Sequence, residues 1–479
     1  MADFNSARCD VIKAEITPFG REGSKPFDIA DMIGSFTISQ SINQVSLLGS
    51  VDVLDGVGML ETIPLRGEEK MLLKLKCYDL DTEIELETRI YKIDGVEIAK
   101  TTKQVSYTLH FITETSFQAG LRRFISAFKK KSASTIVKEI FQKYYGQISP
   151  HKQTAENSEK LPESPGKTLS EKYDLDLDKS DIDSKKRNFY LERTDLNLHI
   201  TIPNYSPSEA ISFVSRRTFR DDNNKSSSFR FFETYSGFYF VSDEWLVERG
   251  AKNVLPGSQN KNIFVYYPFT VNDPIATDEQ VRSLIAFENP RRVDVGSELG
   301  GGAYKNMIVE YDLLRHSINT TTYDYNNQNF KGMKGKPFSP VTDVHSSDFI
   351  KETFTPENAK RFLILKDFSD KQSGTGLIRS NLNLKEIAAR RTMYNHHLNS
   401  TIVSASTRGR LDIEPGQVID VRIKTTDVGD QKNSNSNLSG KYLVHTVIHK
   451  TSDGILTTAM SLMKYDWTDA GVDTSSNSI

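Results

Sequence analysis

The fold is decided by Thr401 to Tyr465, TIVSASTRGRLDIEPGQVIDVRIKTTDVGDQKNSNSNLSGKYLVHTVIHKTSDGILTTAMSLMKY. Apolar and polar residues alternate along it, so that Ile419, Val421 and Ile423 share one face of a strand. The Pro-Gly pair at 415–416 and the Asp-Gly pair at 453–454 supply chain reversals. The stretch therefore predicts an antiparallel meander of about four strands, enough for most of a small β-barrel.

Length and composition set the limits for the rest of the chain. Its 479 residues correspond to about three domains. With 37% hydrophobic and 26% charged residues, the chain has the composition of a globular protein with real cores. The formal net charge is −2, so the chain lacks the basic surplus typical of tight nucleic-acid binding. We expect no sequence-specific nucleic-acid binding, although a neutral channel through which DNA slides is compatible with this charge.

Two cysteines, Cys9 and Cys77, are too few for a disulfide framework and are interpreted as small apolar core residues in a reducing compartment. The sequence contains no signal-peptide pattern and no run of about 18 apolar residues. We therefore expect no membrane anchor and assembly in a cytosol.

The alternating pattern also occurs near the N-terminus. Residues 34–42, 47–53, 71–78, 83–96 and 104–112 each read as short strands separated by turn residues. Residues 1–115 are therefore predicted to form a first β-barrel.

Residues 116–280 are predicted to form a mixed α+β middle domain. Ser132 is a candidate N-cap for a helix, and Ser206-Pro207-Ser208-Glu209 is a capping-box pattern. The aromatic runs 229–233 and 238–241 predict a hairpin that packs on this second helix. Residues 151–187 are poor in apolar side chains and are interpreted as a polar insert.

The second barrel is assigned to residues 281–325 and 376–467, with an insert at 326–375 and a loose tail at 468–479. Asn383 is expected to cap a helix that leads into the opening meander. The predicted fold class is α+β, mainly β, with two tube-type antiparallel barrels.

Candidate chemical sites are weak in this sequence. The basic run Arg122 to Lys131 fits a solvated helix rim or, alternatively, a phosphate or acidic partner. The acidic run Asp174 to Asp183 lacks the glycine and terminal glutamate of a calcium loop. His445 and His449 share a strand face but lack a third ligand at matching spacing. The aromatic hairpin could present rings to a sugar or base. No catalytic, cofactor-binding or metal site is predicted, and no cofactor or enzyme activity is expected.

Three segments together resemble the baseplate hub proteins of contractile-tailed, T-even-like phages. These are residues 36–69, residues 201–240 and residues 411–465. The same resemblance extends to the hub portion of type VI secretion VgrG proteins and to tail proteins of the gene D product type. The inserts at 151–187 and 326–375 are longer than that fold requires.

The resemblance implies a homotrimer that places six barrels in a ring between a sixfold tail tube and a trimeric central spike. Expected partners are the spike and the tail tube or tube initiator, with tape-measure and wedge proteins as further candidates. The expected location is the virion tail baseplate, after assembly in the host bacterial cytoplasm. The candidate interface strands are 71–78 and 441–448, and their candidate residues are Leu73, Leu75, Tyr78, Tyr442, Val444 and Thr446. A cell-wall-degrading tail enzyme and a carbohydrate-binding tail module are the alternatives.

Overall fold

The computed structural model describes most of the secondary structure of the chain. The described residues are 7–18, 26–62, 65–67, 69–78, 82–98, 104–145, 188–195, 197–220, 227–247, 263–267, 282–291, 300–302, 305–312, 316–324, 360–365, 384–398, 401–424 and 438–464. The predicted insert at 151–187, the acidic run within it, the cap residue Asn383 and the tail at 468–479 lie outside them, as does most of the insert at 326–375.

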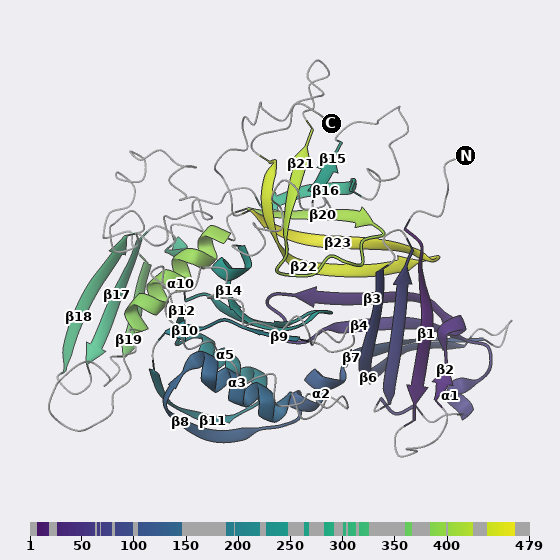
Figure 1. The fold of residues 1–479 in the computed structure, drawn as a ribbon, viewed down its shortest axis with the longest axis horizontal. Helices are drawn as coiled ribbons and strands as arrows, with labels where there is room; N and C mark the ends of the chain where they lie inside the picture. Colours follow the sequence, from purple (N-terminus) through teal and green to yellow (C-terminus); the bar gives the residue numbers. More distant parts are fainter. Residues whose placement is uncertain are drawn as a thin grey trace, which may run out of the picture.

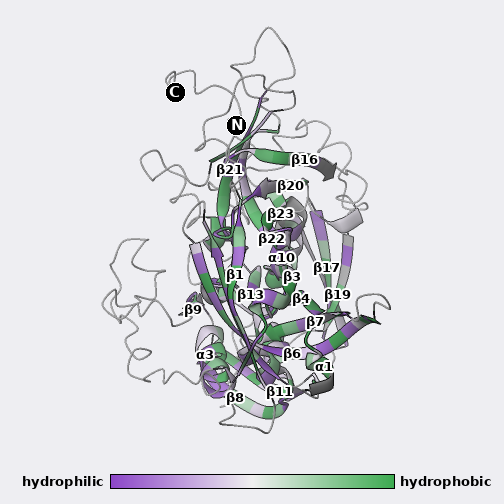
Figure 2. Ribbon diagram, turned by 90° about the vertical axis from the view of Figure 1, so that its right-hand side faces the viewer, coloured by the Kyte–Doolittle hydropathy of each residue, from purple (hydrophilic) through white to green (hydrophobic). Residues whose placement is uncertain are grey.

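The first barrel is a curled antiparallel sheet at the N-terminal end of the chain (Figure 1). In pairing order its strands are β3 (Ile33–Ser41), β4 (Leu48–Asp55), β7 (Val105–Thr113), β6 (Thr82–Ile98), β5 (Lys70–Cys77), β1 (Cys9–Thr17) and the short β2 (Phe27–Asp28). Two short helical turns, η1 (Ala30–Met32) and α1 (Met59–Thr62), connect strands. Buried residues alternate with more exposed ones along β5 and β7, so every second side chain enters a common core. Figure 2 shows this alternation as bands of opposite hydropathy along strands such as β1.

The second barrel contains the C-terminal meander. In pairing order its strands are β16 (Leu284–Arg291), β20 (Ile402–Arg408), β23 (Ile455–Lys464), β22 (Gly440–Ser452), β21 (Val418–Ile423) and β15 (Ile263–Tyr266). A bridge between Val265 and Ser283 brings β15 back to the start of β16. The sheet therefore closes around its own core of Phe264, Val421, Val444 and their neighbours.

The two barrels share one strand order. Leaving out β2 and counting the strands of each barrel along the chain, both sheets pair in the sequence second, third, sixth, fifth, fourth, first. One detail differs, because the first and fourth strands are antiparallel in the first barrel and parallel in the second. The chain is thus built on one architecture used twice.

The middle region packs helices against short strands. It contains α2 (Glu114–Gly120), β8 (Phe124–Ser132), α3 (Ala133–Tyr144), β9 (Asn188–Leu191), β10 (Thr194–Asp195), β11 (Asn197–Tyr205), α5 (Pro207–Ser215), β12 (Phe219–Arg220), β13 (Phe229–Glu233) and β14 (Gly237–Ser242). The helices α3 and α5 lie between the β8–β11 ribbon and the β13–β14 hairpin (Figure 1).

The local predictions for this region are confirmed. The Ser132 side chain accepts a hydrogen bond from the Thr135 amide, 3.2 Å away, at the start of α3. Ser206 and Glu209 form the predicted capping box of α5, in which the Ser206 amide donates to Glu209 Oε2 at 2.8 Å. The aromatic hairpin is β13–β14.

The prediction for the basic run is corrected, because this run lies largely on strand β8 instead of on a helix rim.

A separate three-stranded sheet corrects the predicted extent of the second barrel. Its strands are β18 (Ser317–Asp324), β17 (Lys305–Asp312) and β19 (Lys360–Leu365), and α10 (Leu384–Leu398) packs beside it. Of the strands described within 281–325, β16 alone joins the barrel, while β15 joins it from the region assigned to the middle domain. Alternation identifies a strand but does not select its partner, and that is why β17 and β18 were assigned to the wrong sheet.

The predicted α+β, mainly β fold class is confirmed. Within the described part of the chain, none of the helices combines the length and the apolarity needed to span a membrane.

Candidate functional site: the junction between the two barrels

The two barrels are joined by direct strand pairing. Strand β3 of the first barrel pairs with β22 of the second, from Ser41 opposite Thr446 to Thr37 opposite Lys450. The Thr446 and Ser41 hydroxyls also form a 2.9 Å hydrogen bond across this pair. Figure 1 shows the purple β3 lying along the yellow β22, although these strands are about as far apart in sequence as the chain allows. The pairing makes one continuous sheet of 13 strands from both barrels.

A second link comes from the tip of the β22–β23 hairpin. The Cys9 amide donates to the Gly454 carbonyl at 2.9 Å, and the Leu456 amide donates to the Ala7 carbonyl at 2.8 Å. Leu456 and Leu411 of the second barrel are buried in the core of the first. The core of the first barrel is therefore completed by two residues that follow the end of β7 at Thr113 by 298 and 343 positions.

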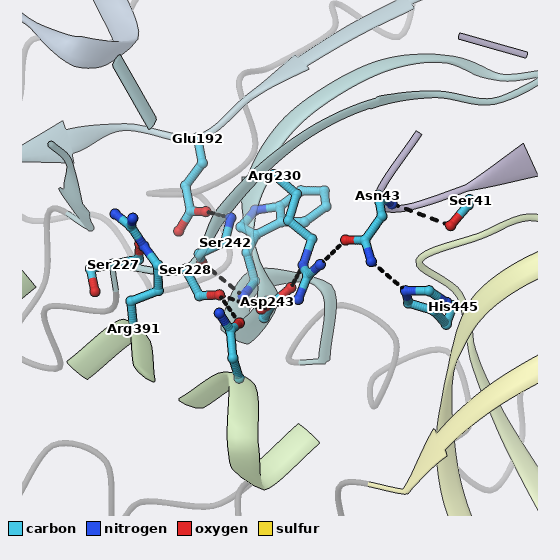
Figure 3. Close-up of polar contacts among 12 residues, drawn as sticks. Ser41, Asn43, Glu192, Ser227, Ser228, Arg230, Ser242, Asp243, Arg391 and His445 are labelled. Carbon is cyan, nitrogen blue, oxygen red and sulfur yellow. Dashed lines mark hydrogen bonds and ion pairs between the residues drawn. The ribbon is translucent and has the colours of Figure 1, made fainter. Parts of the chain in front are cut away.

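A chain of polar side chains connects both barrels to the middle region (Figure 3). Arg230 on β13 is ion-paired with Asp243, with its Nη2 3.0 Å from Oδ2, and also donates to Asn43 Oδ1. Asn43, just after β3, donates through Nδ2 to His445 Nε2 on β22 at 2.8 Å. Because arginine can only donate, it fixes the orientation of the Asn43 amide, and His445 Nε2 must then accept.

His445 is therefore neutral, with its proton on Nδ1, from which it donates to Thr446 Oγ1 at 2.8 Å. Burial, with a further contribution from the charge of Arg230, lowers the pKa of His445 to about 4. Burial likewise lowers the pKa of His449, which contacts Thr458 in the same hairpin, to about 4. The junction thus holds two neutral histidines at physiological pH.

These two histidines make stability pH-dependent. An unfolded histidine binds its proton near pH 6.5, whereas the folded protein resists protonation down to about pH 4. Between these values the unfolded state binds more protons, so the free energy of unfolding should fall as the pH is lowered from about 7 to about 4. For a fully buried histidine such as His449 the slope is about 1.4 kcal/mol per pH unit. Urea unfolding as a function of pH measures it.

The matched variants separate this effect from general acid unfolding. His445→Gln and His449→Gln should each flatten the slope between pH 4 and 6.5. The exposed His316, changed to Asn, should leave the slope as in the wild type. An unchanged slope in both buried-site variants would contradict the assignment.

Two carboxylates, the buried Glu233 and the half-buried Glu414, link the middle region to the two barrels. Glu233 Oε2 accepts hydrogen bonds from the Leu47 amide at 3.0 Å, the Thr113 hydroxyl at 2.7 Å and the Ser116 hydroxyl at 2.8 Å. All three donors belong to the first barrel or to α2, which follows it. Glu414 of the second barrel accepts from the Ser236 hydroxyl at 2.6 Å. The β13–β14 hairpin is therefore hydrogen-bonded to both barrels.

Helix α10 joins the same network from the other side. The Ser228 hydroxyl contacts Asp243 Oδ2 at 2.5 Å and Asn395 Oδ1 at 3.2 Å. The Ser227 hydroxyl donates to the Ile387 carbonyl at 3.0 Å, and Arg391 Nε donates to the Ser227 carbonyl at 3.4 Å (Figure 3). Beside these contacts lies an apolar core with residues from the end of β3, the middle region, the three-stranded sheet, α10 and the second barrel. It includes Ile42, Phe232, Trp245, Ile308, Met393, Val418 and Leu443.

No protein-family model matches this chain, and no curated protein matches its sequence. Among solved structures, it is similar to a tail protein from Neisseria meningitidis MC58, with 8% identity, a TM-score of 0.48 and coverage of 96% of this chain and 98% of that one. It is also similar to the 43 kDa tail protein of prophage MuSo2 from Shewanella oneidensis, with 7% identity, a TM-score of 0.46 and coverage of 95% and 99%. A third is an E. coli component of the type VI secretion system, with 9% identity, a TM-score of 0.41 and coverage of 94% and 77%.

The structure places the six candidate interface residues in different environments. Leu73, Leu75, Tyr442 and Val444 are fully buried in the cores of the two barrels. A side chain without exposed surface has nothing to offer a neighbouring subunit, so these four serve the fold of the subunit itself. Thr446 bonds Ser41 within the chain. Tyr78, which is 49% exposed, keeps its place as a predicted interface residue.

The structure also places the candidate metal ligands and the aromatic hairpin. A bulge between Val444 and Thr446 gives His445 and His449 different environments. In the described residues no group of three or more potential ligands could hold a metal ion. The hairpin rings Phe231, Phe238 and Phe240 are buried against α3 and α5, so these rings are unavailable as a platform for a sugar or base.

The sequence reasoning missed Asn43, Arg230, Asp243 and Glu233, because each acts through partners far away in the chain. One signal pointed to the duplicated architecture. A glycine precedes the fourth strand of each barrel, and Gly67 and Gly416 both adopt positive φ, +85° and +86°. Aligning the loops around these glycines would have indicated two copies of one barrel.

Proposed function

We propose that this chain is the structural hub of a contractile phage tail baseplate. The observation that carries the proposal is the use of one strand order twice in a single chain, with both copies joined by β3–β22 pairing. One subunit then supplies two equivalent positions in a ring. Three subunits supply six, which matches a hexameric tube on one side and a trimeric spike on the other.

The mechanism we propose is symmetry adaptation. The ring nucleates the tail tube above it and docks the central spike below it, with the genome leaving through its channel. The expected partners are two further copies of this chain, the spike, and the tube or tube initiator. The expected location is the virion tail baseplate. The junction described above supports this role, because a rigid link between barrels fixes the angle that the ring must repeat.

Native mass tests the proposal. Light scattering on the purified chain should give a mass of three times 54.1 kDa if the trimer forms alone. Mixed with the spike protein of the same particle, the complex should contain three copies of this chain. The expected trimer can form alone or only with the spike. A chain that stays monomeric under both conditions would overturn the proposal.

The two alternatives have their own assays. A cell-wall-degrading tail enzyme would clear peptidoglycan in a zymogram, and a carbohydrate-binding tail module would bind on a glycan array. The buried aromatic hairpin disfavours the second of these, since its rings were the residues proposed to bind sugar.

A further inference from the structure

The β3–β22 junction within the subunit involves one strand edge from each barrel, and the corresponding edges of the other two strands, on β6 and β16, have no described partner strand. The fifth strand of the second barrel, β22, pairs with the fourth strand, β21, only up to Leu443. Beyond a bulge at His445 it leaves β21 and pairs instead with β3, the second strand of the first barrel. At this junction the fifth strand of one barrel pairs with the second strand of another.

Strand β6 is the fifth strand of the first barrel and repeats these features. It pairs with β5 up to Arg89, and its first bulge lies at Tyr91. A second bulge, between Asp94 and Glu97, has no counterpart in β22. The backbone around the bulges at Tyr91 and His445 also matches: the Ile90 amide donates to the Glu69 carbonyl and the Val444 amide to the Gln417 carbonyl, each at 2.9 Å. Past the bulge at Tyr91, β6 pairs with β7 on one edge, and no described strand occupies its other edge.

That free edge is long and exposed. Residues 92–98 form it, and Val96 and Ile98 on it are 54% and 71% exposed. An unpaired strand edge offers amide and carbonyl groups to any strand that can approach it.

Strand β16 is the second strand of the second barrel and corresponds to β3. Its pairing with β20 begins in the same register as β3 with β4, with a bulge after the first pair, at Ile285 in one and Gly34 in the other. A second bulge, between Glu288 and Arg291, gives β16 one residue more than β3 has over the same stretch. Apart from β20, no described strand pairs with β16, whereas β3 has β22 on its second edge. Its residues Ile285, Ala286 and Glu288 are exposed.

We infer that the free edge of β6 in one subunit pairs antiparallel with β16 of a second copy of this chain, in the register that β22 uses with β3. This inference rests on the proposed hub function for the closure of the ring. The junction inside a subunit and the junction between subunits would then be equivalent, so each barrel meets the next in the same way. A head-to-tail contact of this kind closes into a ring when its rotation closes.

The register can be transferred at the paired positions on either side of these second bulges, since β6 and β16 each have one extra residue between them. Asp94 lies opposite Thr108 of β7 as Ile448 lies opposite Ala459 of β23, and Arg291 lies opposite Ile402 as Ser39 lies opposite Leu48. Because Ile448 pairs with Ser39, Asp94 of one copy faces Arg291 of the next. In the sequence these two positions carry opposite charges, which favours the pair. Within its own subunit, Asp94 is also ion-paired with Lys92.

The same register also puts two like charges together. Glu97 corresponds to Lys450 and Glu288 to Thr37, and Lys450 pairs with Thr37, so Glu97 faces Glu288 of the neighbouring copy. Like charges directly opposed weaken a strand pair. The inferred register therefore contains one favourable and one unfavourable charged pair, and each can be altered separately.

Disulfide trapping tests the register in the full-length protein. The double variant Asp94→Cys with Arg291→Cys, oxidised and run on a non-reducing gel, should give covalent oligomers that end at the trimer. Mixing the two single variants should give covalent dimers only. The matched control is Ile448→Cys with Ser39→Cys, the equivalent pair inside one subunit, which should lose two thiols and stay monomeric on the gel. The native Cys9 and Cys77 are buried and stay in place.

The charge variants give an independent measurement. Glu97→Lys should tighten self-association roughly fivefold at low salt, and Asp94→Lys should weaken it by a similar factor. Light scattering against protein concentration measures both, and both effects should shrink in 0.5 M salt.

The possible failures are distinguishable. A trimer by mass that yields no Asp94→Cys/Arg291→Cys crosslink, while the control pair does crosslink, would overturn this register and leave the hub proposal standing. A chain that remains monomeric alone and with the spike protein would overturn both.

Discussion

Replacing Glu233 with alanine should lower the free energy of unfolding by about 4 kcal/mol, because it leaves three buried donors without an acceptor. The donors are the Leu47 amide and the Thr113 and Ser116 hydroxyls, and all three contact the same carboxylate oxygen. Each unpaired buried donor costs about 1–3 kcal/mol, reduced to the extent that water enters the vacated space. Urea unfolding followed by circular dichroism measures the change.

Two further variants show whether the carboxylate itself is responsible. Glu233→Gln keeps one acceptor oxygen and should lose less than Glu233→Ala. Glu83→Ala removes an exposed carboxylate that pairs with Lys74 on the surface and should change stability by no more than about 0.5 kcal/mol. If Glu233→Ala and Glu83→Ala had the same free energy of unfolding, Glu233 would not stabilise the contact between the middle region and the first barrel.

Gly49→Ala should destabilise the first barrel by about 3 kcal/mol. A Cβ at this position would lie 2.3 and 2.7 Å from two ring carbons of Phe111 and 2.7 Å from the Thr37 carbonyl oxygen. The ring can turn aside only within a packed core, and the carbonyl belongs to the backbone of β3, so the strands must separate. Thermal unfolding should show a lower midpoint for this variant.

The control for Gly49 lies at the end of the same strand. A Cβ added at Gly56 would meet nothing within 4 Å, so Gly56→Ala should stay within about 0.5 kcal/mol of the wild type. Because Thr37 is also the first residue of β3 that pairs with β22, Gly49→Ala should weaken the barrel junction as well. A Gly49→Ala protein as stable as Gly56→Ala would contradict the close packing of β4 between its neighbours.

Local features of the fold could be predicted from the sequence because they depend on neighbours in the chain. The Ser132 cap, the Ser206 capping box and the aromatic hairpin are each specified within about a dozen residues. Most strands of the two barrels were located because alternation with period two marks any half-buried strand, but β15 was missed.

Partner choice could not be read in the same way. The pairing of Ser41 with Thr446 joins residues 405 positions apart, and no local pattern specifies it. The alternation of Leu73, Leu75 and Val444 marks a buried face, but whether the face meets a core or another subunit depends on the closed sheet. The contacts of Asn43 and Arg230 depend on that closure too, and only the structure brings them together.

If two equivalent barrels in each chain build a ring of six, the ring should be visible by electron microscopy. Class averages of the assembled protein, viewed along its axis, should show six lobes with threefold symmetry around an open channel. A ring of three lobes, or particles without a ring, would contradict this arrangement.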